Sequence, residues 1–286
     1  MKNFVRELLH KAHLRGPAFM IYWSARPRAI FHNIPYWIKG APDALPVPPL
    51  KLRARVWGEY TDIRLFLQPN QQIQQVLDIL AQHGAKVDEF EAILDFGCGA
   101  GRALRQFPYL ERHLIKAKIY GTDINPEQIA WCRRNLSFAE FDVNQPYPPL
   151  IYDDAKFDFI YTYSVFTHLP EAHQLLWIDE LSRVLKPGGY LLLTTCGESY
   201  FETLSQNEKE QFRADQLVVR HGELAGVPST YNDCIVFHPV AYVGETLAKE
   251  FEIVHFFPGE ASPSGPKGEM DHYFLRKTFK NNVSLT

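Results

Sequence analysis

The segment that most constrains the fold runs from Ala92 to Arg102 and reads AILDFGCGAGR. Its first five residues, four apolar and one acidic, are typical of a strand in the middle of a parallel sheet. Gly97, Gly99 and Gly101 follow, at positions where side chains would keep a ligand away from the backbone. A helix beginning near Arg102 would direct its N-terminal amides at the same ligand. The sequence therefore predicts a strand, a loop and a helix that together form a cofactor site.

Two classes of cofactor fit such a loop. A dinucleotide fold has the spacing G-x-G-x-x-G and an acid about 20 residues further on. This loop has the spacing G-x-G-x-G, and Asp95 stands two residues before the first glycine. A carboxylate there would repel a pyrophosphate and would suit an ammonium or sulfonium group. The pattern resembles motif I of the class I S-adenosylmethionine (SAM)-dependent methyltransferases.

Acids also stand near the ends of the next two predicted strands. The strand over 118–124 contains Asp123, whose carboxylate can accept both ribose hydroxyls of a nucleoside in either class. Ile124 is then placed to cover one face of the adenine. A third strand over 136–141 ends at Asp142, which we expect to bind the adenine amino group.

The segment over 156–169 separates the two classes. It reads KFDFIYTYSVFTHL and resembles the methyltransferase pattern FDxIxxxxVxxHL. A helix predicted over 171–185 ends at a Lys-Pro-Gly-Gly sequence, and a fifth strand over 190–195 follows. The string LKPGGYLLLTT is a second hallmark of the same family. We expect the inner side of the helix to be formed by Leu175, Leu176, Ile178, Leu181, Val184 and Leu185.

Three ordered motifs across residues 92–195 thus carry the resemblance. It implies an α/β, Rossmann-like fold: a seven-stranded, mostly parallel sheet with helices on both faces and the last strand antiparallel. An N-terminal arm over 1–50 and an insert over 198–237 would be added to a methyltransferase domain over 51–286. The implied cofactor is SAM, and the residues assigned to it are Asp95, Gly97, Cys98, Gly99, Gly101, Asp123, Ile124, Asp142, Val143, Tyr163 and Ser164.

The chain departs from the plain family pattern after the fifth strand. About forty extra residues precede a helix predicted over 239–250 and a strand over 251–257. A last strand over 271–276 would pair antiparallel beside that strand. Insertions at this point commonly form a lid over the acceptor in methyltransferases of small molecules. We therefore expect the acceptor to contact residues in or beside the insert, namely Tyr231, His238 and His221.

His168 is the candidate general base. It follows the fourth strand at the sheet edge where ligands bind in open α/β folds. An amine acceptor needs only its lone pair, whereas a hydroxyl gains from a base whose pKa is near neutral. In the alternative, the imidazole only caps the helix or hydrogen-bonds to the backbone.

Sequence features narrow the acceptor without identifying it. The fourth strand ends in Thr-Tyr-Ser-Val and lacks the Asn/Asp-Pro-Pro-Tyr box of enzymes that methylate a flipped base, which argues against DNA. No set of metal ligands appears. The stretches FHPxxYV and DHYFLRK resemble methyltransferase domains found with bacterial glycosyltransferases, which favours O-methylation of a sugar or other small hydroxylated metabolite. The alternatives are an amine or lipid-linked acceptor, a SAM-fold binding protein without catalysis, and an NAD-binding reductase.

The first fifty residues contain seven prolines, and seven Lys or Arg against two acids. The prolines predict an extended arm packed over the domain, with a short helix over 2–14. Alternatively, residues 1–40 contact an anionic membrane or a partner protein at its surface. Further along the chain, Tyr60 and Arg64 are candidates for binding the SAM carboxylate.

The remaining composition suits a cytoplasmic protein. The four cysteines form no C-x-x-C pair, which is typical of free thiols in a reducing compartment. No apolar run reaches the 18 residues or more of a membrane span. The formal net charge is −3.

Overall fold

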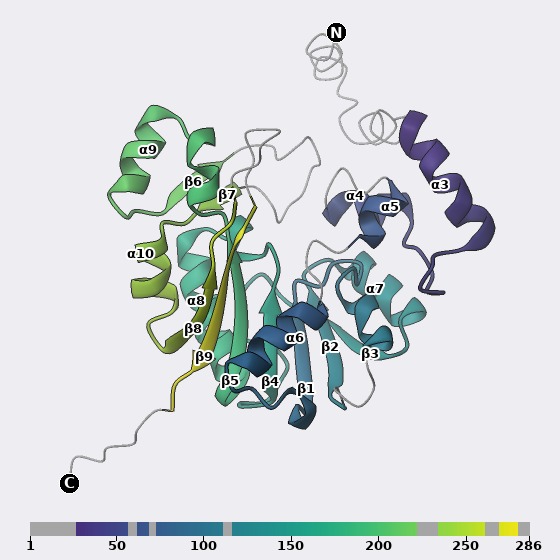
Figure 1. The fold of residues 1–286 in the computed structure, drawn as a ribbon, viewed down its shortest axis with the longest axis horizontal. Helices are drawn as coiled ribbons and strands as arrows, with labels where there is room; N and C mark the ends of the chain where they lie inside the picture. The colour runs from purple at the N-terminus through teal and green to yellow at the C-terminus, as the bar shows by residue number, and fades with distance from the viewer. Residues whose placement is uncertain are drawn as a thin grey trace.

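The computed structural model describes residues 27–56, 62–68, 73–110, 116–221, 234–260 and 269–279. At its centre lies a seven-stranded sheet in the order β3-β2-β1-β4-β5-β9-β8 (Figure 1). Strands β1 to β5 pair in parallel, whereas β9 lies antiparallel between β5 and β8. The predicted fold class is confirmed. The strands of this sheet are β1 (Ala92–Phe96), β2 (Lys118–Asp123), β3 (Ala139–Val143), β4 (Phe157–Thr162), β5 (Leu185–Thr195), β8 (Phe251–Phe257) and β9 (Asp271–Lys277).

Four α-helices precede the first strand of the sheet in the described residues, and the others lie between its strands. The α-helices are α3 (Pro27–Lys39), α4 (Leu50–Val56), α5 (Ile63–Leu67), α6 (Ile73–Gln82), α7 (Pro126–Asn135), α8 (Glu171–Val184), α9 (Gln206–Arg213) and α10 (Val240–Tyr242). The short 3-10 helices are η2 (Val87–Glu89), η3 (Leu104–Tyr109), η4 (Phe166–His168) and η5 (Glu198–Thr203), and a π-helical turn, η6 (Val243–Leu247), follows α10.

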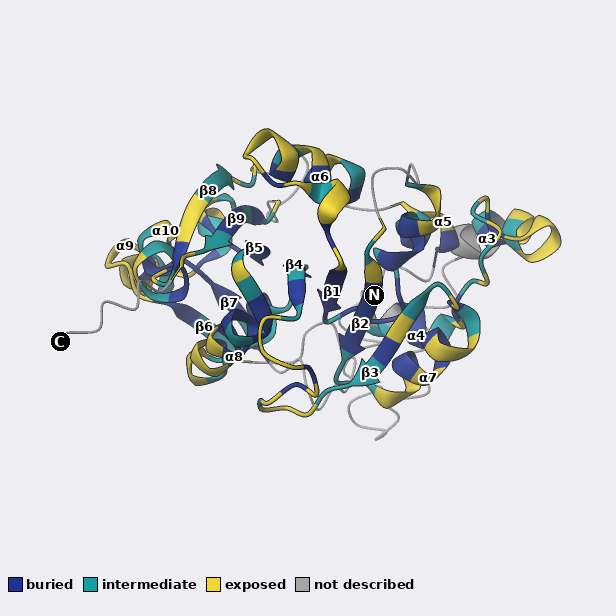
Figure 2. Ribbon diagram, turned by 90° about the horizontal axis from the view of Figure 1, so that it is seen from below, coloured by how far each residue is buried: buried dark blue, intermediate teal, exposed yellow. Residues whose placement is uncertain are grey.

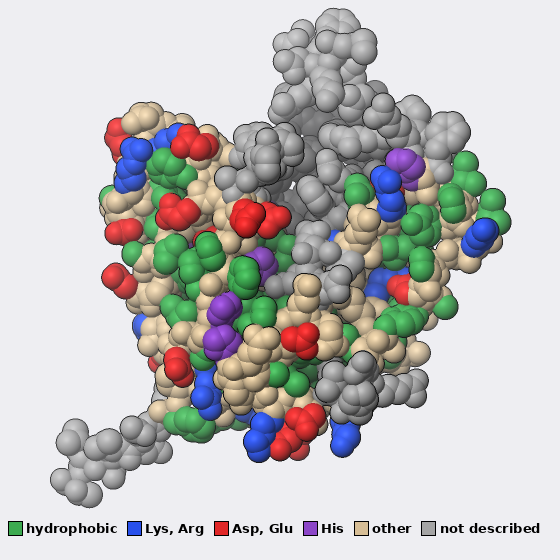
Figure 3. Space-filling view, in the orientation of Figure 1, with side chains coloured by type: hydrophobic (Ala, Val, Ile, Leu, Met, Phe, Trp, Pro, Cys, Tyr) green, Lys and Arg blue, Asp and Glu red, His purple; other side chains and the backbone are tan. Residues whose placement is uncertain are grey.

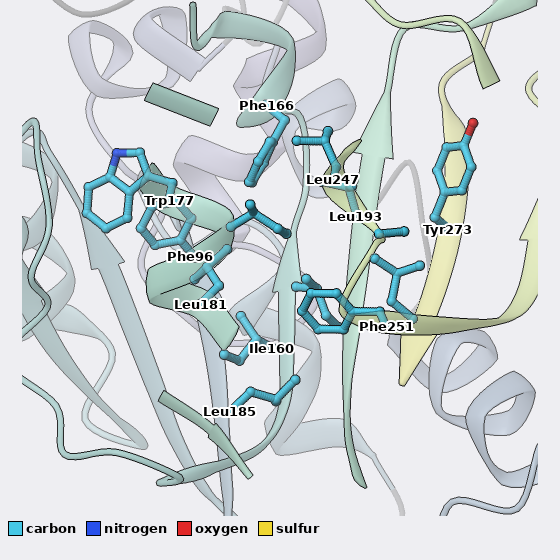
Figure 4. Packing of buried hydrophobic residues seen from close by; sticks show 14 of the residues in the cluster. Phe96, Ile160, Phe166, Trp177, Leu181, Leu185, Leu193, Leu247, Phe251 and Tyr273 are labelled. Carbon is cyan, nitrogen blue, oxygen red and sulfur yellow. The ribbon is translucent and has the colours of Figure 1, made fainter. Parts of the chain in front are cut away.

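The two faces of the sheet bury two separate clusters. Phe96 of β1 points to the face covered by α8 and η6, where Phe166 and Trp177 pack near it (Figure 4), and Leu94 belongs to the same cluster. Ile93 points to the other face, in one cluster with α6 and α7. Helices α6 and α8 therefore lie on opposite sides of the sheet, and the sheet between them is buried (Figure 2).

Two expectations near the cofactor loop are corrected. No α-helix begins at Arg102; a turn leads into the 3-10 helix η3, which contains Pro108. Pro108 lacks an amide and its ring clashes with the preceding turn, which disfavours an α-helix here. The third strand begins at Ala139 and not at Leu136, because the Leu136 amide closes α7 by donating to the carbonyl of Cys132.

Helix α8 buries a different side from the one predicted. Leu175 and Leu176 are exposed, whereas Gln174 and Trp177 are buried. The buried set Gln174, Trp177, Ile178, Leu181 and Val184 recurs every three or four residues, and the two leucines lie across the helix from it. The Lys-Pro-Gly-Gly sequence is an irregularity within β5, which already begins at Leu185.

The insert after β5 contains η5, α9 and a two-stranded antiparallel sheet of β6 (Val218–His221) and β7 (Cys234–Phe237). A parallel bridge between Cys196 and Phe237 attaches this small sheet to the end of β5. The helix predicted over 239–250 is shorter, consisting of α10 and the π-turn η6. Strands β8 and β9 agree with prediction, including their antiparallel pairing.

The N-terminal region is more helical than expected. The extended path predicted for the proline-rich arm is wrong over 27–39, where α3 forms a helix with Pro27 at its start and Pro35 inside it. The short helix predicted over 2–14 lies outside the described residues. Helix α6 buries the face formed by Ile73, Val76, Leu77 and Leu80.

Candidate cofactor and acceptor site

The glycine loop after β1 is hydrogen-bonded to the end of β2. The backbone amides of Gly97 and Cys98 both donate to the carbonyl of Thr122, at 2.8 and 2.9 Å. The Gly99 amide donates to Oδ2 of Asp123 at 2.8 Å. The ends of β1 and β2 are therefore one rigid unit, as the predicted site requires.

Glycine is needed in this loop for both conformation and space. Gly97 has a φ of +82°, and a Cβ there would lie 2.3 Å from Cγ2 of Val165. Gly101 has a φ of +73°, and its Cβ would lie 2.4 Å from Cδ1 of Leu136. Residues that carry a side chain rarely adopt such φ values, and a Cβ would not fit at either position. The loop therefore packs directly against the turn that follows β4.

Asp123 is held in a single orientation at the end of β2. Its Oδ2 accepts from the Gly99 amide, and its Oδ1 accepts from the Asn125 amide at 2.8 Å. Each carboxylate oxygen keeps a second lone pair, so two vicinal hydroxyls of a ribose can still donate to it. Burial raises the pKa of Asp123, and the two backbone amides oppose that rise.

Asp95 is a buried acid on the neighbouring strand. Only 3 % of its surface is exposed. Burial raises the pKa of its carboxyl to about 8; the Asp123 carboxylate adds to the rise, and the Tyr161 hydroxyl opposes it. A cationic ligand group would favour the ionised form at neutral pH. The residues therefore fit SAM, which carries an ammonium and a sulfonium group.

The alternative cofactor, a dinucleotide, would need free backbone donors for its pyrophosphate. The amides of Gly97, Cys98 and Gly99 donate within the protein, and that of Gly101 donates to the carbonyl of Cys98. No α-helix N-terminus follows, because the next element is the 3-10 helix η3. The loop geometry therefore favours SAM. Burial also raises the pKa of the Cys98 thiol well above its ordinary value, which agrees with a packing role.

The predicted adenine contacts lie at the ends of β2 and β3. Val143 pairs in register with Asp123, and Ile124 is the residue after Asp123 in the chain. All three residues are half-buried. One oxygen of Asp142 forms an ion pair with Arg133 at 3.0 Å, which directs the carboxylate toward α7. The ion pair leaves the other carboxylate oxygen to receive an amino group.

Tyr163 and Ser164 form the turn after β4 that faces the glycine loop through Val165. Ser164 has a φ of +58°, an uncommon conformation for a residue other than glycine. The turn is fixed by the Ser164 amide, which donates to Oγ1 of Thr194 on β5 at 2.8 Å. Strained, well-supported backbone of this kind concentrates at ligand sites.

His168 lies on the same connection, in η4. Its Nδ1 is 3.0 Å from the backbone carbonyl of Cys234 on β7. A carbonyl only accepts, so Nδ1 carries the hydrogen and Nε2 carries the lone pair. Burial lowers the pKa of His168, which keeps the ring neutral at pH 7. The structure thus contains both features weighed in the sequence, a backbone hydrogen bond and a neutral imidazole that can accept a proton.

A buried amide supports the His168 turn. The side chain of Gln174 is fully buried and donates to the carbonyls of Phe166 and Leu169, at 3.1 and 2.7 Å. Its oxygen lies 3.2 Å from Nε2 of His238. We name this group, with the His168–Cys234 hydrogen bond, the η4 clasp. It joins the turn after β4 to the closing strand of the insert.

The residues expected to bind the acceptor or the SAM carboxylate lie in different environments. His238 belongs to the core: it is fully buried, and burial lowers its pKa to about 3, so its assignment to the acceptor is not supported. His221 is exposed at the end of β6. Tyr231 and Tyr60 lie outside the described residues. Arg64 forms an ion pair with Asp62 on the surface of α5.

Asp271 is a further candidate residue at this edge of the sheet, and it was not among those predicted. It opens β9 and pairs with Thr195 at the edge of the sheet where β5 ends. Its Oδ1 accepts from the Gly259 amide at 2.7 Å, and its Oδ2 has no hydrogen-bond partner among the described residues. Burial, with Glu198 nearby, raises its pKa to about 6. The sequence feature that could have indicated it is an acid at the first position of a strand. Because β9 runs antiparallel to β5, its first residue lies beside the last residue of β5.

In the described ranges, no group of three or more His, Cys, Asp or Glu could hold a metal ion. The same ranges contain no helix that is both long and apolar enough to cross a bilayer.

Comparisons with known proteins agree with this geometry. The family described as Methyltransferase domain matches residues 94–193. A sterol 24-C-methyltransferase from Schizosaccharomyces pombe is 24 % identical over 173 residues, which cover 56 % of this chain and 41 % of the relative. A fatty-acid O-methyltransferase from Mycolicibacterium smegmatis is 33 % identical over 114 residues, which cover 39 % of each chain. The chain thus spans about two-fifths of the length of these curated relatives.

Two solved structures share the fold. A SAM-dependent methyltransferase from Methanosarcina mazei has a TM-score of 0.50 at 23 % identity, covering 71 % of this chain and 98 % of that one. The 1,6-didemethyltoxoflavin-N1-methyltransferase of Burkholderia thailandensis, solved with S-adenosylhomocysteine (SAH), has a TM-score of 0.51 at 16 % identity. The match covers 82 % of this chain and 92 % of that one. The segment over residues 94–193 therefore matches a methyltransferase domain family, the chain shares the fold of SAM-dependent methyltransferases, and SAM is the cofactor that its loop geometry fits.

Proposed function

We propose that this protein transfers a methyl group from SAM to a hydroxyl of a sugar or another small hydroxylated acceptor. The observation that carries the proposal is His168, a neutral imidazole whose Nε2 holds the lone pair at the end of β4. A hydroxyl nucleophile gains from such a base, whereas an amine does not need one. The similarity to a fatty-acid O-methyltransferase supports methylation at oxygen.

The chain's own residues have separate roles in this proposal. Asp123 accepts the ribose hydroxyls, Asp95 binds the cationic amino-acid end, and Ile124 and Val143 hold the adenine. Bound SAM supplies the methyl group and a sulfonium leaving group. Nε2 of His168 would accept the proton that the acceptor hydroxyl loses on methylation. The Cys234 carbonyl, bonded to Nδ1–H, stabilises the imidazolium that results.

The domain division is part of the same proposal. Residues 51–286 form the methyltransferase domain, and the insert over 198–237 closes over the acceptor. Residues 1–50 form an N-terminal arm with a role outside the chemistry. All four cysteines are free and buried, which supports a reducing, cytoplasmic setting.

The His168 variant tests the base. We expect His168→Ala to lower turnover at least about tenfold while SAH affinity, measured by calorimetry, stays unchanged. His83→Ala is the matched control, because His83 is an exposed histidine on the turn after α6. Equal turnover in the His168 variant and the wild type would remove His168 as the base.

The acceptor is tested separately, with labelled SAM and a cell extract fractionated into glycan, lipid and small-molecule pools. Label in the glycan or small-molecule pool as an alkali-stable ether supports the proposal. A lipid-linked acceptor is the second candidate, because the relatives include sterol and fatty-acid methyltransferases, and label in the lipid pool would establish it. Binding of NAD(H) in preference to SAH would overturn the assignment altogether.

A further inference from the structure

Helix α3 exposes three large apolar side chains on one side. Ile34, Trp37 and Ile38 are 38 %, 62 % and 77 % exposed. Their spacing of three and four residues places them next to one another on the helix surface. Hydrophobic side chains gather over this helix in Figure 3, and Figure 2 shows the end of α3 exposed and projecting from the body of the protein.

The rest of α3 is anchored to the protein by polar contacts. Oδ1 of the buried Asn33 accepts from the Ile63 amide of α5 at 2.7 Å. Nδ1 of His32 lies 2.7 Å from Oδ2 of Asp62, the residue that caps α5. The apolar side is therefore presented outward by a helix whose other side is fixed. A docked helix that exposes contiguous large apolar groups marks an interaction surface.

The charge distribution indicates what this surface binds. Residues 1–50 hold seven Lys or Arg and two acids, a net charge of +5. The whole chain has 30 Lys or Arg and 33 acids, so residues 51–286 hold 23 against 31, a net charge of −8. A chain whose N-terminal segment is basic while the remainder is acidic is attracted to an anionic surface through that segment. Tryptophan beside isoleucine and lysine is the combination that favours the bilayer interface.

We propose that α3 docks this protein on an anionic lipid membrane, with Ile34, Trp37 and Ile38 inserted at the level of the headgroups and Lys39 among the phosphates. The contact is peripheral. It requires neither the proposed acceptor nor catalysis, so it stands or falls independently of the proposed function.

The test is co-sedimentation of the full chain with lipid vesicles. We expect binding to vesicles of 30 mol % phosphatidylglycerol in phosphatidylcholine, and weak binding to phosphatidylcholine alone. The double variant W37S/I38S should lose at least about tenfold in partition coefficient, because two apolar side chains no longer leave water. This variant keeps every Lys and Arg, so the loss reports the apolar side of α3.

The matched control is L175S/L176S, which replaces two exposed leucines on α8, and it should bind vesicles as the wild type does. SAH affinity and the melting temperature should be equal in all three proteins, which shows that α3 was changed without unfolding the domain. Equal vesicle binding by W37S/I38S and the wild type would overturn the proposal. So would a wild-type dimer in sedimentation analysis that W37S/I38S abolishes, since a second copy would then cover α3.

Discussion

The proposed cofactor half, formed by the ends of β1 to β3, and the proposed acceptor half, formed by η4 and the insert from η5 to β7, are held together in different ways. The ends of β1 and β2 are joined by short backbone hydrogen bonds and by glycines that leave no room for side chains. The acceptor half is joined through the η4 clasp, between residues 64 and 66 positions apart in the chain. The first half therefore depends on local motifs, and the second on a few buried polar side chains far apart in sequence.

The largest expected effect comes from the glycine loop. Gly97→Ala should weaken SAH binding more than about 100-fold and destabilise the fold by ~2 kcal/mol or more, because the new Cβ meets Val165 at a left-handed φ. Calorimetry and denaturant unfolding measure the two effects. The control is Gly84→Ala, where φ is +87° but nothing lies within 4 Å of the added Cβ. Similar losses in both variants would show that φ alone, and not contact with the β4 turn, makes the loop sensitive.

The second prediction breaks the η4 clasp. Gln174→Ala leaves the carbonyls of Phe166 and Leu169 without their donor in a buried place, which should cost ~2–3 kcal/mol of unfolding free energy. Turnover should fall several-fold, while SAH affinity changes less than twofold. Gln206→Ala, on the exposed start of α9, is the control and should alter neither. A loss of SAH affinity equal to the loss of turnover would mean that the two halves are not separable.

The third prediction concerns Asp95 and pH. Because its pKa is about 8 without ligand, SAH affinity should rise about tenfold between pH 6.5 and pH 8, as the carboxylate forms while the SAH amino group still carries its proton. Asp95→Asn should bind more weakly and lose this dependence. Calorimetry across that range is the measurement, and a flat profile for the wild type would contradict it.

The same acid affects stability with the opposite sign. A carboxyl whose pKa is raised in the folded state binds more protons than the unfolded chain between about pH 4 and pH 8, so its contribution to folding falls as pH rises through that window. Asp95→Asn should therefore raise the melting temperature of the free protein at pH 8. If the variant melts lower at pH 8 than the wild type, Asp95 is ionised in the free protein.

The smallest effect is expected at Asp142, on the adenine side. Asp142→Ala should weaken SAH binding only about three- to fivefold, because its carboxylate is partly exposed and shared with Arg133. Titration with adenosine analogues that lack the amino group should show no further loss in the variant. A full further loss would place the amino group elsewhere.

Much of the cofactor half could be predicted because its signals are local. The strand at Ala92, the loop glycines and the acid at the end of the second strand all follow from residues within a few positions of one another, whereas the architecture of the sheet was implied by the family resemblance. The α-helix expected at Arg102 is instead the 3-10 helix η3, whose Pro108 lacks the amide that an α-helical turn would use.

The acceptor half could not be predicted to the same degree. Nothing near His238 in the sequence indicates that Gln174 lies against it. His238 was therefore expected to contact the acceptor, although it is a core residue. Asp271 was missed because its position at the sheet edge depends on β9 running antiparallel beside β5. The prediction for the buried side of α8 was wrong because it followed the leucines. Gln174 is buried instead, and its side chain finds its hydrogen-bond partners, the carbonyls of Phe166 and Leu169, only in the folded protein.

The position of β9 also sets the order in which the sheet can assemble during synthesis. Strand β8 pairs only with β9 in the described sheet, and β9 comes later in the chain. Until residues 271–277 have left the ribosome, β5 and β8 each present an unpaired edge, whereas β1 to β4 already have their neighbours. A nascent chain can therefore complete its SAM-binding side first, and it needs protection from aggregation at the acceptor side until the last strand inserts.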